Sequence, residues 1–184
     1  LKRKYEKYII QKMSFKDSTF TQTLEPRIFY SYTSYEDQSM LPMFDTALVD
    51  LNAQSIFSEN QFVGGDRVMD SHQVTLGGTT RFIDAYGMER ISGTIAQRFY
   101  IGERTVLEES QFNNSSAQND SSDLFVSASA LIAKGLKLNV DTQYNLDESS
   151  TNRATIGAKY NPRSGKLLNA SYRLVKNPAN SEYD

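Results

Sequence analysis

Cysteine and tryptophan are absent from the 184-residue chain, and histidine occurs once, at His72. The absence of thiols excludes a disulfide scaffold, a thiolate zinc site and a cysteine nucleophile. One imidazole cannot supply the several ligands or bases that a metal cage or a Ser-His nucleophile needs. Lys and Arg number 20 against 22 Asp and Glu, a formal net charge of −2, which excludes a strongly basic nucleic-acid binder. We therefore expect no catalytic residue, metal, cofactor or nucleic-acid partner.

Long apolar runs are also absent. The longest nearly apolar stretch, Leu124 to Ala133, is interrupted by Ser127 and Ser129 and is shorter than the ~20 residues of a spanning helix. The first residues show no signal-peptide pattern, and the abrupt ends suit a piece of a longer protein. With 39% hydrophobic residues the chain can nevertheless bury a core or a face.

Strict alternation of apolar and polar residues recurs along the chain. In Leu136–Asn145, the odd positions Lys137, Asn139 and Asp141 are polar, whereas the even ones are apolar or suited to an apolar face. Successive side chains of a strand point to opposite faces, so each such segment predicts a strand with one apolar and one polar face. About eight strands of roughly membrane-crossing length are predicted, near Lys4–Lys12, Thr23–Tyr32, Val74–Phe82, Ile91–Ile101, Leu124–Ala133, Leu136–Asn145, Arg153–Tyr160 and Leu168–Leu174.

The expected connections alternate between short and long. Short turns are predicted at Ser14–Asp17, Ala85–Gly87, Lys134–Gly135 and Pro162–Gly165, and long polar connections at Ser34–Asp70, Gly102–Ser122 and, shorter, Asp147–Asn152. All short turns then fall at one end of an up-and-down sheet, which is typical of outer-membrane barrels. The predicted fold is all-β, an antiparallel up-and-down transmembrane β-barrel section. We expect one partial barrel domain over residues 1–184, with long loops near 34–70 and 102–122.

Aromatic residues on the predicted apolar faces gather near the strand ends. Those near the long loops are Tyr30, Tyr32, Phe99, Tyr144 and Tyr172, and those near the short turns are Phe82 and Tyr160. Aliphatic residues lie between the two groups. Membrane–water interfaces select such rims, whereas a soluble sandwich buries its large rings in mid-strand. The pattern favours lipid contact, with these seven residues at the membrane interfaces.

The opposite faces carry charges that would line a hydrated lumen and face substrate or a plug. These candidates are Glu25, Arg27, Arg81, Arg98, Lys137, Asp141, Lys159 and Arg173. The alternative for each is structural pairing across strands, for example Glu25 with Arg81. Pro26 removes a ladder hydrogen bond, so we expect it at an edge, a bulge or a strand start.

Several ordered motifs carry a family resemblance. Gln22 to Arg27 with Phe29-Tyr30 resembles the QTLEPR-x-FY stretch of the LptD family of outer-membrane lipopolysaccharide-assembly proteins. Further matching pieces follow in the family's order, at Leu41–Asp45, Ile56–Phe62, Gly65–Val68, Gln73–Gly77, Thr80–Phe82, Gln97–Tyr100 and Lys166–Tyr172.

The resemblance implies a middle section of a barrel of about two dozen strands in the outer membrane of a Gram-negative bacterium. Such proteins accept lipopolysaccharide from periplasmic bridge proteins through an N-terminal domain that this chain does not contain. They release it into the outer leaflet through a lateral gate, with an LptE-like lipoprotein plug in the lumen. The gate lies between the first and last strands, so we assign no gate residues here. The implied partners are lipopolysaccharide, the plug, the bridge proteins and outer-membrane lipids.

A second interpretation stays open at this stage. A soluble or secreted β-sandwich binding module, with recognition carried by its long loops, has similar alternating strands. A general porin or receptor barrel shares the architecture but lacks the ordered motifs.

Overall fold

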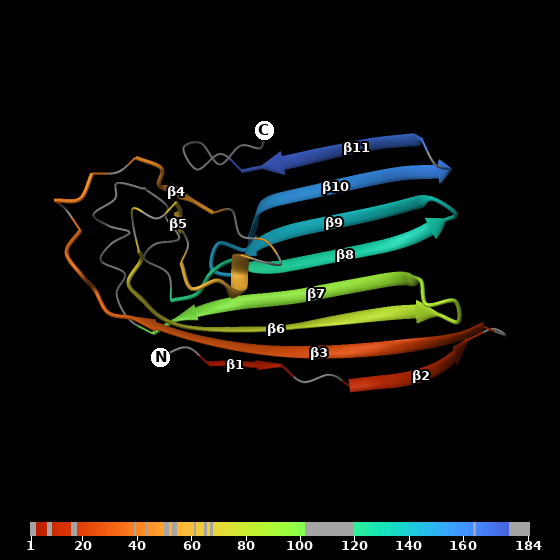
Figure 1. Cartoon of the computed structure of the whole chain (residues 1–184), viewed down its shortest axis with the longest axis horizontal. Helices are drawn as coiled ribbons and strands as arrows, with labels where there is room; N and C mark the ends of the chain where they lie inside the picture. The colour runs from red at the N-terminus through yellow and green to blue at the C-terminus, as the bar shows by residue number, and fades with distance from the viewer. Residues whose placement is uncertain are drawn as a thin grey trace.

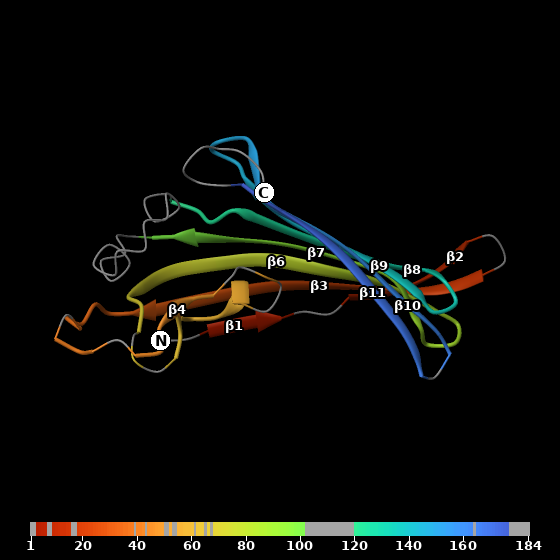
Figure 2. The same cartoon turned by 90° about the horizontal axis from the view of Figure 1, so that it is seen from above.

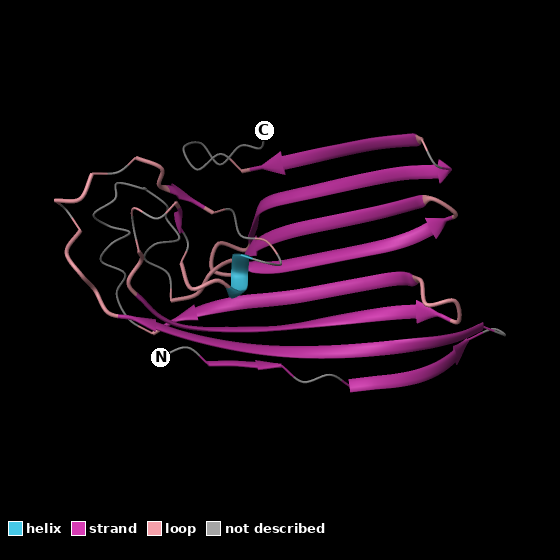
Figure 3. Cartoon of the chain, viewed as in Figure 1, coloured by secondary structure: helices cyan, strands magenta, loops and turns pink. Residues whose placement is uncertain are grey.

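The computed structural model of the chain describes residues 3–6, 9–15, 18–38, 40–42, 44–49, 52, 55–60, 62–64, 66, 68–101, 120–163 and 165–176. These residues form strands and one short 3₁₀ helix, η1 (Figure 3). The elements are β1 Arg3–Glu6, β2 Ile9–Phe15, β3 Ser18–Thr33, β4 Ala47–Leu48, η1 Ser55–Phe57, β5 Phe62–Val63, β6 Ser71–Asp84, β7 Glu89–Tyr100, β8 Leu124–Ala133, β9 Leu136–Asn145, β10 Ser150–Arg163 and β11 Lys166–Val175. Within the described part, no helix has the length and hydropathy of a membrane-spanning segment.

One large antiparallel sheet dominates the structure (Figure 1). Its nine strands run in the order β1-β3-β6-β7-β8-β9-β10-β11, with β2 also paired to β3. Because β1 and β2 follow one register along the same edge of β3, the nine strands occupy eight positions. This arrangement confirms the expected all-β, up-and-down class. The sheet is strongly twisted, as Figure 2 shows, which is the normal consequence of right-handed strand twist.

The turns that join β6 to β7, β8 to β9 and β10 to β11 lie at one end of the sheet, and the long connection from β3 to β6 lies at the other (Figure 1). The connection from β9 to β10, residues 146–149, also lies at the loop end, but it is as short as the turns, unlike the longer connection that the sequence predicts. Tight turns join β6 to β7 and β8 to β9, where Gly87 and Gly135 adopt φ values of 77° and 79°. Such positive φ values favour glycine, because it has no Cβ to clash with the backbone. The connection from β3 to β6 spans residues 34–70 at the other end. Most of the other expected long loop, residues 102–119, lies outside the described residues.

The start of β10 differs from the sequence expectation. The sequence predicts a connection over residues 147–152, but β10 begins at Ser150. The register shifts between Thr151 and Arg153, so Asn152 forms a bulge in the pairing with β9. A bulge interrupts the alternation of faces, which is why the sequence pattern ends there. The Asn152 amide donates a 2.8 Å hydrogen bond to Asp123, which links β10 to the segment before β8.

The apolar face of the sheet has no second layer among the described residues. The residues that define this face are Leu24, Ile28, Leu76, Ile95, Val126, Val140, Ile156 and Leu168. Residues two positions away on the same strand, or directly paired with them, belong to the same face. Ile95, Val140 and Ile156 are 52%, 41% and 55% exposed although they lie in mid-strand. A sandwich would bury such positions against a second sheet. The β-sandwich interpretation therefore has no support in the described residues.

Buried apolar contacts lie instead on the opposite, polar face. Here Ile56 of η1 packs with Ala96 of β7 and Phe125 of β8, and Phe57 joins them. The small core therefore joins the long connection to the polar face of the sheet.

Pro26 lies within β3, away from both ends of the strand. On one side, Pro26 pairs with Gly78 of β6 in an uninterrupted register. On the other side, β1 ends opposite Arg27 and β2 begins opposite Leu24. Proline has no N–H to donate to a neighbouring strand. Residues 7 and 8, which separate β1 from β2, lie outside the described residues, so only the β6 side can be compared with the sequence expectation. On that side Pro26 lies in mid-strand and in regular pairing, and not at the edge, bulge or strand start that the sequence predicts.

Candidate functional site

Part of the connection between β3 and β6, around η1, folds back over the polar face. Figure 1 shows η1 against the loop ends of β7 and β8. Ile56, at the centre of η1, is fully buried there. The connection therefore covers part of the surface that sequence analysis predicted to be open.

Arg98 of β7 holds this segment in place. Its Nη2 donates hydrogen bonds to the carbonyl oxygens of Ser55, Ile56 and Ser58, at 3.1, 2.6 and 3.1 Å. The guanidinium is charged, so these are charge-assisted hydrogen bonds, which are stronger than bonds between neutral groups. The side chain of Arg98 is fully buried. Arg98 thus anchors the connection and does not lie on an open surface.

Two side chains of β6 add to this anchor. The Thr75 hydroxyl donates a 3.2 Å hydrogen bond to the Ile56 carbonyl oxygen, and the Gln73 amide donates one of 3.5 Å to that of Ser58. Both residues are fully buried on the polar face. Polar strand residues are therefore paired with the backbone of the connection instead of with water.

Gly77 provides the space for the Phe57 ring. A Cβ on Gly77 would lie 2.7 Å from Phe57 Cζ and 2.9 Å from Ala96 Cβ, too close for a real side chain. The guanidinium carbon of Arg27 lies 5.7 Å from the centroid of the same ring, in cation–π geometry. The ring therefore packs directly on the backbone of β6.

The rest of the connection has internal structure of its own. The Asp66 carboxylate accepts hydrogen bonds from the backbone N–H groups of Phe44 and Asp45, at 3.0 and 2.8 Å. The side chain of Gln38 bonds the backbone of Val68 through both its oxygen and its nitrogen, at 3.0 and 2.8 Å. Strands β4 and β5 pair with each other. These contacts organise the connection beyond η1.

Nearer the short turns, charged side chains form a ladder across the polar face. Glu25, only 4% exposed, pairs with Arg81 and lies 3.9 Å from Arg27. Arg81 in turn lies 3.4 Å from Glu89, which is 3.9 Å from Lys137. The ladder alternates in sign, so its members largely neutralise one another. The pairing of Glu25 with Arg81 was one of the alternatives open from the sequence.

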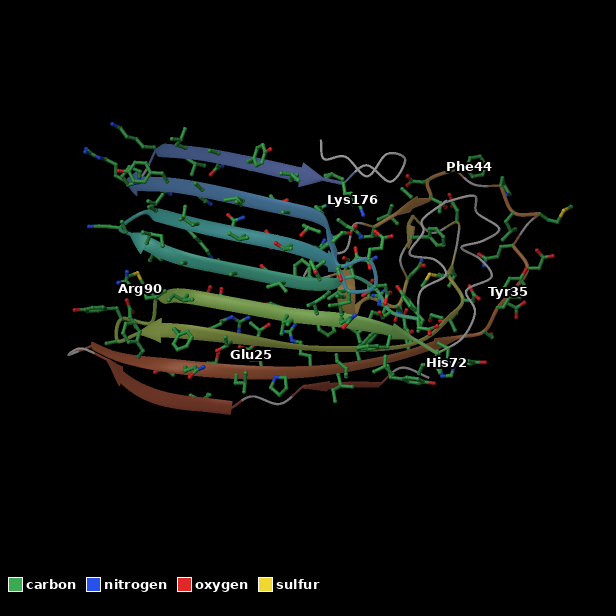
Figure 4. The ribbon with its side chains drawn as sticks, turned by 180° about the vertical axis from the view of Figure 1, so that it is seen from behind. Glu25, Tyr35, Phe44, His72, Arg90 and Lys176 are labelled. Carbon is green, nitrogen blue, oxygen red and sulfur yellow. The ribbon has the colours of Figure 1, made fainter. Side chains whose placement is uncertain are left out.

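The eight charged candidates therefore fall into different environments. Glu25, Arg27 and Arg81 belong to the ladder, Lys137 is at its end, and Arg98 anchors the connection. Asp141, Lys159 and Arg173 form no ion pair with any described residue, and both cations of this group are exposed. Figure 4 shows Glu25 near the middle of the sheet, with Arg90 at the short-turn end and His72 at the loop end.

The seven aromatic candidates all lie on the apolar face. Tyr30 and Tyr32 contact the His72 ring edge-on, at centroid distances of 5.8 and 5.5 Å. The register pairs Tyr30 with Val74 and Val74 with Phe99 near the long loops, and Tyr144 with Leu124 at the same end. Phe82 and Tyr160 lie near the short turns, opposite Ile91 and Leu136. Tyr172 is different, because it pairs with Ile156, which lies opposite Val140 in mid-strand.

Two carboxyl groups at the loop end have shifted pKa values. Burial raises the pKa of Asp123, and the negative charges of Glu148 and Asp147 act in the same direction. A hydrogen bond from Lys176, 2.7 Å long, lowers the pKa of Glu148. Among the residues that the structure describes, no group of three or more His, Cys, Asp or Glu side chains is arranged to hold a metal ion.

Comparison with known proteins gives the family. The sequence model of the family described as "LptD: LPS transport system D" matches residues 6–184. The chain belongs to the LptD family. It is 43% identical over 158 residues to the LPS-assembly protein LptD of Cupriavidus necator, a match that covers 84% of this chain and 19% of the relative.

Other LptD relatives match over a similar extent. The proteins of Paraburkholderia xenovorans and Thiobacillus denitrificans are 40% and 35% identical, over 90% and 89% of this chain and 20% and 22% of their own lengths. The chain thus spans about a fifth of these LptD proteins. Its open antiparallel sheet is consistent with a β-barrel section of LptD.

The residues that dock the connection were not predicted from the sequence. Ile56, Phe62 and Met69 are buried although they lie in a segment expected to be a polar loop. A signal for their docking was present in the strands, because Phe29, Ala96 and Phe125 are apolar residues at polar-face positions. All three are buried in the structure.

Proposed function

We propose that this chain is part of the wall of an outer-membrane LptD barrel that delivers lipopolysaccharide to the outer leaflet. The observation that carries the proposal is the difference between the two faces of one sheet. The apolar face has no covering layer among the described residues, whereas the polar face carries charges and the folded connection. A spanning sheet needs an outward apolar face and an inward polar one.

The apolar face would contact hydrocarbon, with the aromatic candidates Tyr30, Tyr32, Phe82, Phe99, Tyr144 and Tyr160 at its two rims. Tyr172 is paired with a mid-strand residue of β10. It can lie at the membrane interface only if the tilt of the strands brings this part of β11 to the depth of the interface. Strands in such barrels tilt by roughly 35–45°. Tilt displaces directly paired residues along the membrane normal, so one row crosses several depths.

The polar face would line the lumen. Connection 34–70, anchored by Arg98, narrows the lumen from the long-loop side. We propose that an LptE-like lipoprotein plug contacts this side, and that periplasmic bridge proteins deliver lipopolysaccharide from the short-turn side through another part of the protein. The role is non-enzymatic, since the chemistry would consist of solvating and guiding a charged glycolipid.

Photocrosslinking in cells tests this proposal with a matched pair of positions on β8. A photoreactive residue replaces Ser127 on the polar face or Val126 on the apolar face of the full-length protein. We expect a lipopolysaccharide adduct at Ser127 that disappears when the periplasmic supply is depleted. At Val126 we expect adducts with lipids of the surrounding membrane. These adducts should persist when the periplasmic supply is depleted, because those lipids are already in the membrane. A Ser127 position without a supply-dependent adduct contradicts the proposal.

A further inference from the structure

Two lysines lie directly opposite each other on the polar face near the short turns. The register pairs Lys137 of β9 with Lys159 of β10. Directly opposed residues of antiparallel strands have Cβ atoms about 4.5–5.5 Å apart, and like charges at that separation repel. Both side chains are exposed. The pair is therefore unfavourable for the sheet itself.

Anions among the described residues neutralise the pair only in part. The nearest carboxylate to Lys137 is that of Glu89, 3.9 Å away, and Glu89 also pairs with Arg81. Lys159 forms no ion pair with any described residue. Asp141 lies four residues along β9 from Lys137, and Arg173 of β11 adds a further exposed cation on this face. This region contrasts with the alternating ladder around Glu25, where the charges are paired.

Uncharged polar side chains surround the two lysines. In the next row, Asn139 lies over Gly157, where a Cβ would come within 2.6 Å of its amide oxygen. That row continues to Ser171, and the lysine row continues to Asn169 of β11. Amide and hydroxyl groups of this kind hydrogen-bond sugar hydroxyls. The lysines add the charge that phosphoryl groups require.

We propose that Lys137 and Lys159, flanked by Asn139, Asn169 and Ser171, bind the phosphoryl groups of a phosphorylated saccharide that is part of the transported glycolipid. This inference rests on the proposed function and assigns a specific contact within it. The cationic patch lies near the short turns, which is the end at which substrate enters in that proposal. A bound phosphoryl group would lie between the two ammonium groups and remove their mutual repulsion.

The test uses the full-length protein with its lipoprotein partner in detergent micelles. It measures binding of purified lipopolysaccharide, of the same lipopolysaccharide stripped of phosphate, and of inorganic phosphate as a competitor. The double variant Lys137→Gln/Lys159→Gln is compared with Arg163→Gln/Lys166→Gln. The control also removes two opposed, exposed cations, but at the β10–β11 turn.

We expect the lysine double variant to bind phosphorylated lipopolysaccharide about tenfold more weakly or worse, as loss of charge-assisted hydrogen bonds implies. Its binding of the stripped glycolipid should match that of the unmodified protein, and the control variant should bind both normally. The thermal unfolding midpoint of the lysine double variant should stay level or rise, because a repulsion is removed. A residue pair with a merely structural role would lower that midpoint.

Three results overturn the inference. If the lysine double variant loses affinity equally for both glycolipid forms, or loses none, the lysines do not bind the phosphoryl groups. The proposed function is still supported in that case, because the protein binds the glycolipid. Displacement by inorganic phosphate at concentrations equal to the glycolipid shows a site for free anions instead. If the unmodified protein binds neither glycolipid form, the proposed function fails, and this inference fails with it.

Discussion

Arg98 of β7 donates a 2.6 Å hydrogen bond to the carbonyl oxygen of Ile56, a residue 42 positions earlier in the chain. Both residues are fully buried. This contact ties the β3–β6 connection to the polar face of the sheet, at a place where a barrel wall would otherwise face water. The shape of the proposed lumen therefore depends on how this connection is anchored.

The substitution Arg98→Met should release η1 from the sheet. The change removes charge-assisted hydrogen bonds to three carbonyl groups, each contributing roughly 1.5–3 kcal/mol. We expect the docked state of the connection to lose about 3 kcal/mol or more while the strands stay paired. The measurement is the rate at which a thiol reagent labels Ile56→Cys in the full-length protein. Labelling should be close to undetectable while Arg98 is in place and rapid in the Arg98→Met background.

Arg90→Met provides the control for this experiment. Arg90 lies on the same strand but pairs with Asp84 at the short-turn end, at 2.6 Å. Its loss should leave the Ile56→Cys position protected. Equal protection in the Arg98→Met background would show that the apolar contacts hold the connection without the arginine.

Gly77→Val should displace the Phe57 ring and weaken docking by roughly 1–3 kcal/mol, as overpacking does. The added Cβ would lie within 3.0 Å of both the ring and Ala96. The neighbouring change Gly78→Val is the matched control, because its Cβ meets nothing closer than 4.0 Å. Urea unfolding of the full-length protein measures both, and Phe57→Ala should rescue part of the Gly77→Val loss. Equal effects at the two glycines would contradict the assigned packing.

Charge on the apolar face should be costly where the same charge on the polar face is tolerated. Val140→Lys places an ammonium at the proposed bilayer midplane, at a cost of roughly 2–4 kcal/mol. Ser127→Lys, opposite Asp141 on the neighbouring strand β8, places the charge on the polar face and should cost less than about 1 kcal/mol. The free energy of unfolding in lipid bilayers measures the difference. Equal losses of stability at the two positions would show that the two faces do not contact different environments, hydrocarbon on one side and water on the other.

The stability of the loop end should depend on the ionisation of Asp123. Burial raises the pKa of this carboxyl above its ordinary value of 3.8, so between the two pKa values the folded state binds more protons than the unfolded state. Stability from this group is therefore present at low pH and declines as pH rises through the raised value. Asp123→Asn should remove that decline and still accept the hydrogen bond from Asn152. Urea unfolding of both forms from about pH 3 to about pH 7 checks the sign, and a steeper decline in the variant would refute it.

The fold was largely predictable because one physical rule governs it. Alternation along Leu136–Asn145 predicted β9 with its correct bounds, since a strand has a strict period of two. The rule failed at Asn152, where a bulge changes the period. The position of Pro26 was also wrongly predicted, because β3 pairs with β6 through the proline without a bulge. The site was less predictable. Arg98 alternates like any other polar-face residue, and only the path of a connection from 40 or more residues away buries it. Phe29 and Phe125, apolar residues at polar-face positions, indicated in the sequence that part of the polar face is covered. They did not indicate which segment covers it.

Spin-label accessibility along β9 tests the central claim most directly. Labels at Leu138, Asn139, Val140 and Asp141 of the full-length protein, in bilayers, are exposed to oxygen, which partitions into lipid, and to a water-soluble nickel complex. The account predicts oxygen-dominated relaxation at Leu138 and Val140 and nickel-dominated relaxation at Asn139 and Asp141. Labels at Leu138 and Val140 that are shielded from both reagents, or reached mainly by nickel, would show that the apolar face does not meet hydrocarbon.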